Sequence, residues 1–282
     1  MRLGVDVGGT FTDLIGWDGH RVVVGKMLTT PDQAEGVLEG ARALMGSQTT
    51  EVLLHGTTAA TNAVLEGRGA RVALVTNRGL EDVIEIARQD RPSLYDPMAD
   101  RPEPLVPRHL RFGMAERPGA GGDSGPLSHE DEVASGRPEA VAVALLYAFE
   151  NGAAEEELSE RLSKVLAGVP ISLSSRVVPE FREYERVSTT VLNAYLMPLV
   201  GAYLRSLQRR GSEDRAATNV LVMRSSGGLM AIEAAQDLPT AVLLSGPAGG
   251  AMASAALSRA HSLQRAVSFD MGGTSTDVCR IE

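Results

Sequence analysis

The chain has 282 residues, enough for about two domains, and its 27 basic against 36 acidic side chains give a formal net charge of −9. This acidic balance argues against binding nucleic acid or an anionic membrane by bulk charge, so any bound phosphate requires local backbone N–H groups, a metal or a few cations. A single cysteine, Cys279, excludes an internal disulfide and a cluster of thiolate ligands around a metal.

The first 125 residues predict short alternating strands and helices, followed by a loop. Apolar stretches favour strands at residues 2–7, 14–17, 22–24, 52–55 and 71–76. Helical spacing of apolar residues predicts helices at residues 31–45, 58–66 and 80–88. Residues 91–125 lose this periodicity and are rich in Pro, Gly and Arg, which indicates a loop region. The pattern is typical of an α/β protein.

Regular structure is expected again from residue 140. Strands are predicted at residues 140–149, 171–173, 220–223 and 266–269, and helices at residues 153–166, 181–208 and 245–258. Pro198 predicts a break or kink in the long helix. The longest apolar run, residues 140–149, is too short to cross a bilayer, and the N-terminus has no apolar signal core. We therefore expect a cytoplasmic protein without a membrane partner.

One motif occurs twice. Residues 6–13 read Asp-Val-Gly-Gly-Thr-Phe-Thr-Asp, residues 270–277 read Asp-Met-Gly-Gly-Thr-Ser-Thr-Asp, and six of the eight positions are identical. Each copy follows a short apolar strand and precedes another, which predicts two related halves whose turns face one cleft. Because only five residues follow the second copy, we expect the chain to be truncated within its second half.

This strand–turn–strand motif suits phosphate binding. Its glycines permit positive φ and close approach, so that consecutive backbone N–H groups can hold an anion, and Thr10 and Thr274 add hydroxyl donors. Asp6 and Asp270, at the ends of their strands, can hold a hydrated Mg²⁺ that bridges phosphate oxygens. The alternative for each copy is a tight hairpin without a ligand, and the repetition of the flanking Asp and Thr argues against it.

The motifs resemble the two phosphate hairpins of the actin, sugar kinase and Hsp70 ATPase superfamily. More narrowly, the chain is similar to the N-terminal part of the hydantoinase A/5-oxoprolinase family. The matching segments are residues 4–13, 55–62, 88–96, 182–186, 193–195, 245–250 and 269–277. The resemblance implies an α/β, ribonuclease H-like fold of the actin/Hsp70 type, its first half plus the start of the second, with a mixed β-sheet and flanking helices. It also implies an N-terminal domain over residues 1–180 and the start of a catalytic domain over residues 181–282.

The resemblance implies ATP-dependent hydrolysis of a cyclic amide such as hydantoin, N-methylhydantoin or 5-oxoproline. ATP would phosphorylate the amide oxygen, and the activated ring would then open. ATP and Mg²⁺, or another divalent metal, are the implied cofactors, and a hydantoinase B-type second subunit and an oligomer are the implied partners. Three alternatives stay open: a subunit of an acetone or acetophenone carboxylase, a small-molecule kinase of the same superfamily, and a non-catalytic nucleotide-binding subunit.

The resemblance also implies three groups of site residues. Catalytic roles fall on Asp6, Asp270 and His55, and the two aspartates also hold the metal. Cofactor binding falls on Gly8, Gly9, Thr10 and Thr12 in the first hairpin and on Gly272, Gly273 and Thr274 in the second. Substrate binding falls on Thr57, Thr58, Asn62, Arg88 and Arg91.

Several of these residues have other interpretations. A helix N-cap beside a satisfied histidine explains residues 55–58 equally well, and a solvated charged loop explains Arg88 and Arg91. Asp13 and Asp277 are expected to cap their turns, and residues 182–186 to form a solvated helix face. Residues 245–250 open a helix, where an anion is favoured, although close helix packing also explains their glycines.

Overall fold

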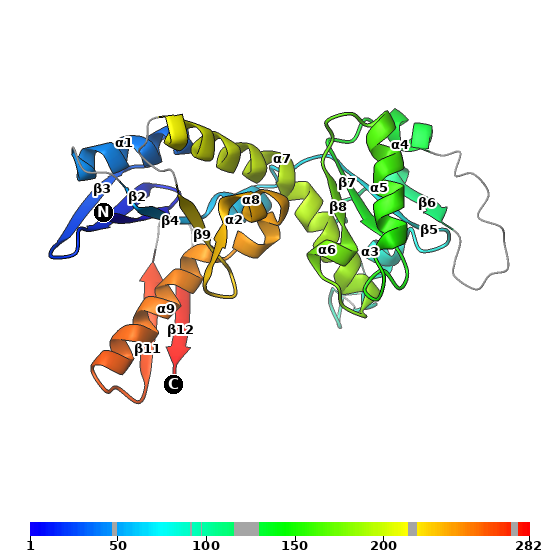
Figure 1. The fold of residues 1–282 in the computed structure, drawn as a ribbon. Helices are drawn as coiled ribbons and strands as arrows, with labels where there is room; N and C mark the ends of the chain where they lie inside the picture. Colours follow the sequence, from blue (N-terminus) through cyan, green and yellow to red (C-terminus); the bar gives the residue numbers. More distant parts are fainter. Residues whose placement is uncertain (47–49, 91, 97, 116–129, 214–218, 272–275) are drawn as a thin grey trace. The chain divides into compact units, whose positions relative to one another are not determined.

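The computed structural model describes residues 1–46, 50–90, 92–96, 98–115, 130–213, 219–271 and 276–282. The chain folds into two compact units (Figure 1). Unit 1 combines Met1–Arg68 with Leu199–Glu282, and unit 2 is the intervening Gly69–Pro198. Each unit is built around its own sheet.

The sheet of unit 1 has six strands in the order β10-β9-β4-β1-β2-β3. Its strands are β1 (Arg2–Val7), β2 (Phe11–Trp17), β3 (Val22–Leu28), β4 (Val52–Thr57), β9 (Val220–Met223) and β10 (Leu229–Ala231). The β1–β2–β3 meander and the β9–β10 pair are antiparallel, whereas β4 runs parallel to both β1 and β9. This mixed sheet agrees with the expected ribonuclease H-like topology, and it carries the first motif on its central strand β1.

The two faces of this sheet differ because successive side chains of a strand point to opposite sides. One face buries Leu3, Val5, Val7 and Leu14, and helix α1 (Gln33–Met45) packs on the meander. The other face carries Asp6, Asp13 and Lys26 together with exposed apolar side chains. Further helices of unit 1 are α2 (Ala59–Leu65), α8 (Ile232–Asp237), α9 (Ser245–Ala260) and the C-terminal part of α7 (Glu183–Glu213).

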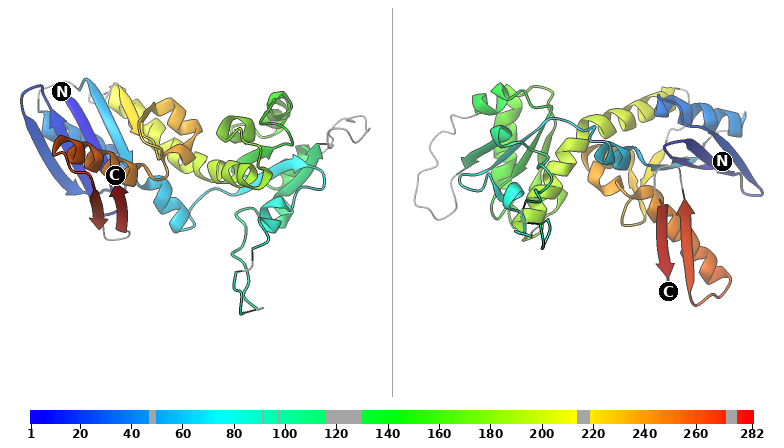
Figure 2. Two further views of the ribbon diagram at one scale, coloured as in Figure 1. Left: turned by 90° about the horizontal axis from the view of Figure 1, so that it is seen from below. Right: turned by 180° about the vertical axis from the view of Figure 1, so that it is seen from behind.

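The second copy of the motif forms the hairpin β11 (Ala266–Met271) and β12 (Thr276–Ile281), which lies beside α9 (Figure 2). Its register reproduces that of the first hairpin. Asp270 pairs with Asp277 as Asp6 pairs with Asp13, and Met271 pairs with Thr276 as Val7 pairs with Thr12. The repeat in the sequence is therefore a repeat in backbone structure.

Unit 2 contains a four-stranded parallel sheet in the order β6-β5-β7-β8. Its elements are β5 (Val72–Asn77), α3 (Val83–Ile86), β6 (Arg111–Ala115), α4 (Glu130–Ser135), β7 (Ala140–Ala144), α5 (Ala153–Val165), β8 (Ile171–Leu173), α6 (Ser174–Val177) and the first part of α7. The central strands β5 and β7 are buried along their whole length, as expected for a parallel sheet. Val75, Val143, Leu158 and Leu162 belong to its core.

Three predicted elements differ in length. The strand expected over residues 140–149 ends at Ala144, and Tyr147 then takes a positive φ of 60° in a turn. The helix expected over residues 80–88 is reduced to α3, because Ala87 has a positive φ of 51°. The loop region 91–125 contains β6, which the sequence did not reveal.

Helix α7 continues through Pro198, where a break or a kink was expected, so the break does not occur. The boundary between the two compact units falls at this proline. By length and composition α7 is the one helix among the described residues that could cross a membrane, but 56% of its apolar window is buried inside the protein. Its apolar side chains therefore serve packing within this fold.

The compact units divide the chain differently from the expected domains 1–180 and 181–282. Strand β9 adds to the sheet beside β4, with Leu53 opposite Val220, so both ends of the chain build unit 1. This long-range pairing leaves no local mark in the sequence.

Candidate functional site

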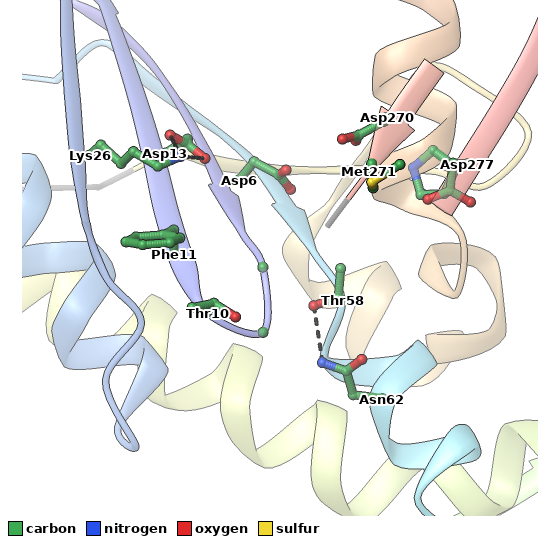
Figure 3. Close-up of a pocket in the computed structure, with 14 residues that line it drawn as sticks. Asp6, Thr10, Phe11, Asp13, Lys26, Thr58, Asn62, Asp270, Met271 and Asp277 are labelled. Carbon is green, nitrogen blue, oxygen red and sulfur yellow. Dashed lines mark hydrogen bonds and ion pairs between the residues drawn. The ribbon is translucent and has the colours of Figure 1, made fainter. Parts of the chain in front are cut away.

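A cavity of about 420 Å³ in unit 1 gathers both copies of the motif (Figure 3). It is bordered by the β1–β2 turn, the start of α2, the start of α9 and the facing ends of β11 and β12. Its lining residues are Asp6, Gly8, Gly9, Thr10, Phe11, Asp13, Lys26, Thr58, Asn62, Gly246, Pro247, Asp270, Met271 and Asp277.

The β1–β2 turn forms one wall of the cavity with Gly8, Gly9 and Thr10. The Gly8 N–H donates to the Phe11 carbonyl over 3.0 Å, which closes the turn. A Cβ atom at Gly8 would lie 3.0 Å from that same carbonyl oxygen, so a larger residue would strain the turn. Backbone atoms therefore form the wall of the cavity at Gly8. Phosphate oxygens can approach backbone N–H groups closely at such a wall.

Four carboxylates line the cavity, two from each hairpin. Asp6 and Asp13 are cross-strand neighbours, and Asp270 and Asp277 repeat that pairing. The Asp6 side chain is open to the cavity, yet surrounding atoms partly desolvate its carboxylate. This desolvation, and then the charges of Asp13 and Asp270, raise the pKa of the Asp6 carboxyl group above its ordinary value. A bound cation would relieve this repulsion.

A hydrated Mg²⁺ fits this donor set. Among the described residues, no three His, Cys, Asp or Glu side chains are grouped to hold a metal by themselves. Mg²⁺ usually keeps several waters and takes one or two carboxylates together with substrate phosphate oxygens. Asp6 and Asp270 are therefore the residues that would hold it, as the motif predicted.

The start of α2 and the start of α9 complete the cavity. Thr58 Oγ1 donates to the Val7 carbonyl over 3.1 Å and accepts from Asn62 Nδ2 over 3.2 Å (Figure 3). Ser245 Oγ donates to the Thr57 carbonyl over 2.9 Å and accepts from the Thr57 N–H over 3.3 Å, which attaches the beginning of α9 to the end of β4. The N-terminal N–H groups of a 16-residue helix favour an anion at this position.

His55 is not placed for the expected catalytic role. Its imidazole is almost fully buried, and Nε2 lies 2.8 Å from the Tyr203 hydroxyl. Burial lowers the pKa of His55 to about 4, so the ring is neutral at physiological pH. His55 does not line the carboxylate cavity. Its side chain contributes to the interior of unit 1.

Thr57 and Thr12 also differ from their expected roles. Both side chains are buried and neither lines the cavity. Thr57 Oγ1 accepts from the Ala59 N–H over 3.1 Å, which holds the turn that leads into α2. Thr12 Oγ1 lies 3.1 Å from Thr29 Oγ1, and Thr29 in turn donates to the Gly8 carbonyl. Thr12 therefore stabilises the β1–β2 turn from the buried face of the sheet.

Arg88 belongs to unit 2. Its guanidinium forms a bidentate ion pair with the Glu185 carboxylate, with Nη2–Oε distances of 2.5 and 2.6 Å, and lines a surface groove that also includes Tyr184. Residues 182–186 are not only a solvated helix face, because the Arg186 side chain at this helix start is buried. Arg91, Gly272, Gly273 and Thr274 lie outside the described residues.

Lys26 is a cavity residue that sequence reasoning missed, whereas Gly246 and Pro247 belong to the segment 245–250, where a helix start that favours an anion was expected. Asp13 was expected to cap its turn, but it forms an ion pair with Lys26. The signal for Lys26 was available in the strand alternation, because residues 22, 24, 26 and 28 share one face of β3. The tertiary fold brings the start of α9 to the first hairpin.

Two family models match the chain. The hydantoinase/oxoprolinase N-terminal region matches residues 2–166, and the hydantoinase/oxoprolinase model matches residues 186–282. The chain belongs to the hydantoinase/oxoprolinase family. The resemblance inferred from the motifs is thereby confirmed.

Individual relatives share this sequence along its length. An uncharacterized protein of Methanocaldococcus jannaschii is 37% identical over 99% of this chain and 43% of its own length. Caprolactamase subunit alpha of Pseudomonas jessenii is 32% identical over 98% of this chain and 43% of its own length, and the crystal structure of that ATP-dependent caprolactamase superposes with a TM-score of 0.81.

A nucleotide-free structure of acetone carboxylase, an ATP-dependent enzyme, superposes with a TM-score of 0.84 at 25% identity. The superposition covers all of this chain and 44% of the acetone carboxylase chain. The two superpositions confirm the expected mixed α/β fold. The chain spans less than half the length of these relatives, and the relatives with described activities act on a cyclic amide or on a ketone.

Proposed function

We propose that this chain forms the phosphate-binding part of an ATP-dependent enzyme that hydrolyses a cyclic amide. The observation that carries the proposal is the cavity where Asp6 and Asp270, from two hairpins of identical register, face each other beside the Gly8–Thr10 turn. Such symmetry has a chemical use when a polyphosphate and its metal lie between the two hairpins. A ligand-free turn needs neither the paired carboxylates nor the helix start beside them.

Each wall of the cavity has a part in this proposal. The Gly8–Thr10 backbone and the start of α9 bind phosphate oxygens through N–H groups. Asp6 and Asp270 would hold Mg²⁺, which would supply positive charge to neutralise the phosphate groups. Thr58 and Asn62, on the wall formed by α2, orient the amide toward the terminal phosphate.

In the proposed reaction the amide oxygen of the ring attacks the γ-phosphorus, and the bond from phosphorus to the ADP oxygen breaks. Phosphorylation removes the resonance that protects the amide. Water then adds to the activated carbon and the ring C–N bond breaks, which gives an amine and an acyl phosphate. A second water hydrolyses the acyl phosphate to a carboxylate and inorganic phosphate. A hydantoinase B-type second subunit is the proposed site of this ring opening, within an oligomer. Hydantoin, N-methylhydantoin, 5-oxoproline and a caprolactam-like lactam are the substrates that we propose to test.

An acetone or acetophenone carboxylase subunit is the second candidate, because the fold superposes equally well on acetone carboxylase. In that case the same cavity would activate a ketone and bicarbonate. The phosphate-binding residues would be the same in both reactions, so the two candidates differ in the acceptor alone.

The test is phosphate release from MgATP by the protein that carries this chain, purified from its own host with any associated subunit. We expect at least one cyclic amide to stimulate ATP hydrolysis. Stimulation by acetone or acetophenone with bicarbonate, and by no cyclic amide, would support the carboxylase instead. MgATP binding without stimulation by either class would indicate a non-catalytic nucleotide-binding subunit.

A further inference from the structure

Lys26 occupies a defined place in the row of charges on the open face of the unit 1 sheet. Asp6 on β1 is opposite Asp13 on β2, and Asp13 is opposite Lys26 on β3. The three side chains lie on the same face of adjacent strands (Figure 3). This row borders the wall made by the Gly8–Thr10 turn.

Two contacts hold the Lys26 ammonium group in this row. Its Nζ donates to both Asp13 carboxylate oxygens, over 2.7 and 2.9 Å, and lies 4.9 Å from the centroid of the Phe11 ring. Both side chains of the ion pair are more than half exposed. An exposed ion pair of this kind adds little stability, so the ammonium group can exchange Asp13 for a stronger acceptor at little cost.

The charge of the cavity makes such an exchange favourable. Lys26 is the one cationic side chain among the described residues that line it, against the four carboxylates of Asp6, Asp13, Asp270 and Asp277. A triphosphate adds several more negative charges, of which one Mg²⁺ neutralises two. A lysine carries a compact charge on a flexible four-carbon stem, which suits it to follow a phosphate group.

We propose that Lys26 binds the terminal phosphate of the nucleotide in this cavity, and that Asp13 positions Lys26 when that phosphate is absent. The inference rests on the proposed function and adds a specific cationic contact to it. A charge-assisted hydrogen bond between Nζ and the γ-phosphate distinguishes ATP from ADP, which lacks that group. Asp13, which competes for the same ammonium group, opposes binding.

The experiment measures the Kd of MgATP and of MgADP by calorimetry, without an acceptor substrate, in the protein that carries this chain. Lys26→Met keeps the stem and removes the charge. We expect it to weaken MgATP binding about tenfold or more, the value of one charge-assisted hydrogen bond, and to change MgADP binding less than about twofold. Lys26→Arg should restore part of the MgATP affinity. Arg21→Met is the matched control, because Arg21 pairs with Asp18 in the turn between β2 and β3.

The Asp13→Asn variant tests the positioning role. We expect MgATP binding to become tighter in Asp13→Asn, and this gain to shrink in the double variant with Lys26→Met. A residue that only stabilises the sheet would not tighten binding. Equal weakening of both nucleotides by Lys26→Met, or no weakening, would overturn the proposal while leaving the phosphate-binding function intact. Failure of the unsubstituted protein to bind either nucleotide would overturn the proposed function itself.

Discussion

The two copies of the motif have the same strand register but very different surroundings. Val5 in the first hairpin is 3% exposed, whereas Phe269 at the equivalent position of the second is 62% exposed. Leu14 is 5% exposed and its counterpart Val278 is 63% exposed. The first hairpin lies inside a six-stranded sheet covered by α1, and the second is a two-stranded ribbon beside α9.

This difference separates two properties of the motif. The register and the paired carboxylates come from the eight-residue pattern itself, because both copies have them. Burial comes from neighbouring strands and helices, because only one copy has it. A two-stranded ribbon is marginally stable alone, so the second hairpin depends on what packs around it.

The largest expected loss of activity comes from replacing the equivalent aspartate of either hairpin. Asp6→Asn and Asp270→Asn should each lower substrate-stimulated ATP hydrolysis by at least about 100-fold, because each removes a ligand of the proposed metal. Turnover against Mg²⁺ concentration measures this. Thermal stability of Asp6→Asn at pH 7 should be unchanged or slightly higher, since the ionised form is disfavoured in the folded protein. Unchanged turnover in either variant would remove that residue from the reaction.

The raised pKa of Asp6 also predicts a pH dependence. The carboxylate takes up a proton at a higher pH than an ordinary aspartate, so Mg²⁺ affinity should begin to fall earlier on acidification. Titration of Mg²⁺ binding between pH 7 and pH 4 in the presence of ATP measures this. A midpoint at the ordinary value for aspartate would contradict it.

The difference in burial is tested by truncating equivalent apolar residues. Leu14→Ala should lower the free energy of unfolding by about 2–5 kcal/mol, because it leaves a cavity in the sheet core. Val278→Ala, the matched control in the second hairpin, should change it by less than about 0.5 kcal/mol. Urea denaturation of both variants makes the comparison. Equal losses would show that the second hairpin is buried in solution.

The buried His55, in the sheet that holds the first hairpin, makes the stability of the fold depend on pH. With a folded pKa of about 4 against 6.5, His55 binds a proton more readily in the unfolded chain. Its contribution to stability is therefore complete above pH 6.5 and is lost on acidification, at about 1.4 kcal/mol per pH unit down to pH 4. The His55 imidazole resonances, followed by NMR, should not titrate above pH 5. Titration near pH 6.5 would show that the ring is open to water.

The smallest expected effect concerns the spacing between β4 and β1. A Cβ atom at Gly56 would lie 2.8 Å from Asp6 Oδ1, so Gly56→Ala should displace the carboxylate and lower turnover about tenfold. Gly250→Ala on α9 is the control, because nothing lies within 4 Å of its Cβ position, and it should leave turnover unchanged. Equal activity of the two variants would mean that Asp6 has room to move.

Much of the candidate site could be predicted from the sequence, because it is local. A strand, a Gly-Gly-Thr turn and a second strand bring Asp6 near Gly8 and Thr10 whatever the rest of the fold. The repeat places Asp270 opposite Asp277 as Asp6 is opposite Asp13. Thr58 and Asn62 are one helical turn apart and reach the cavity together. The errors concern residues whose side chain direction depends on distant elements.

Residues 55–57 show why those errors arose. The end of β4 met the start of α2 as expected, but alternation along the strand turned His55 and Thr57 into the core, where His55 meets Tyr203 of α7, 148 positions later in the chain. Arg88 belongs to unit 2, where its guanidinium pairs with Glu185, 97 positions later in the chain. No short-range pattern reports on such contacts.

The sequence by itself determined the two hairpins, their register, the paired aspartates and the family, since each depends on residues a few positions apart. The tertiary structure alone decided which faces were buried, that β9 joins β4, and that the start of α9 and Lys26 border the same cavity as Asp6. The physical reason is that strand pairing and helix packing join residues up to 264 positions apart, such as Asp6 and Asp270. Such contacts depend on the free energy of the whole fold rather than on local conformational preference.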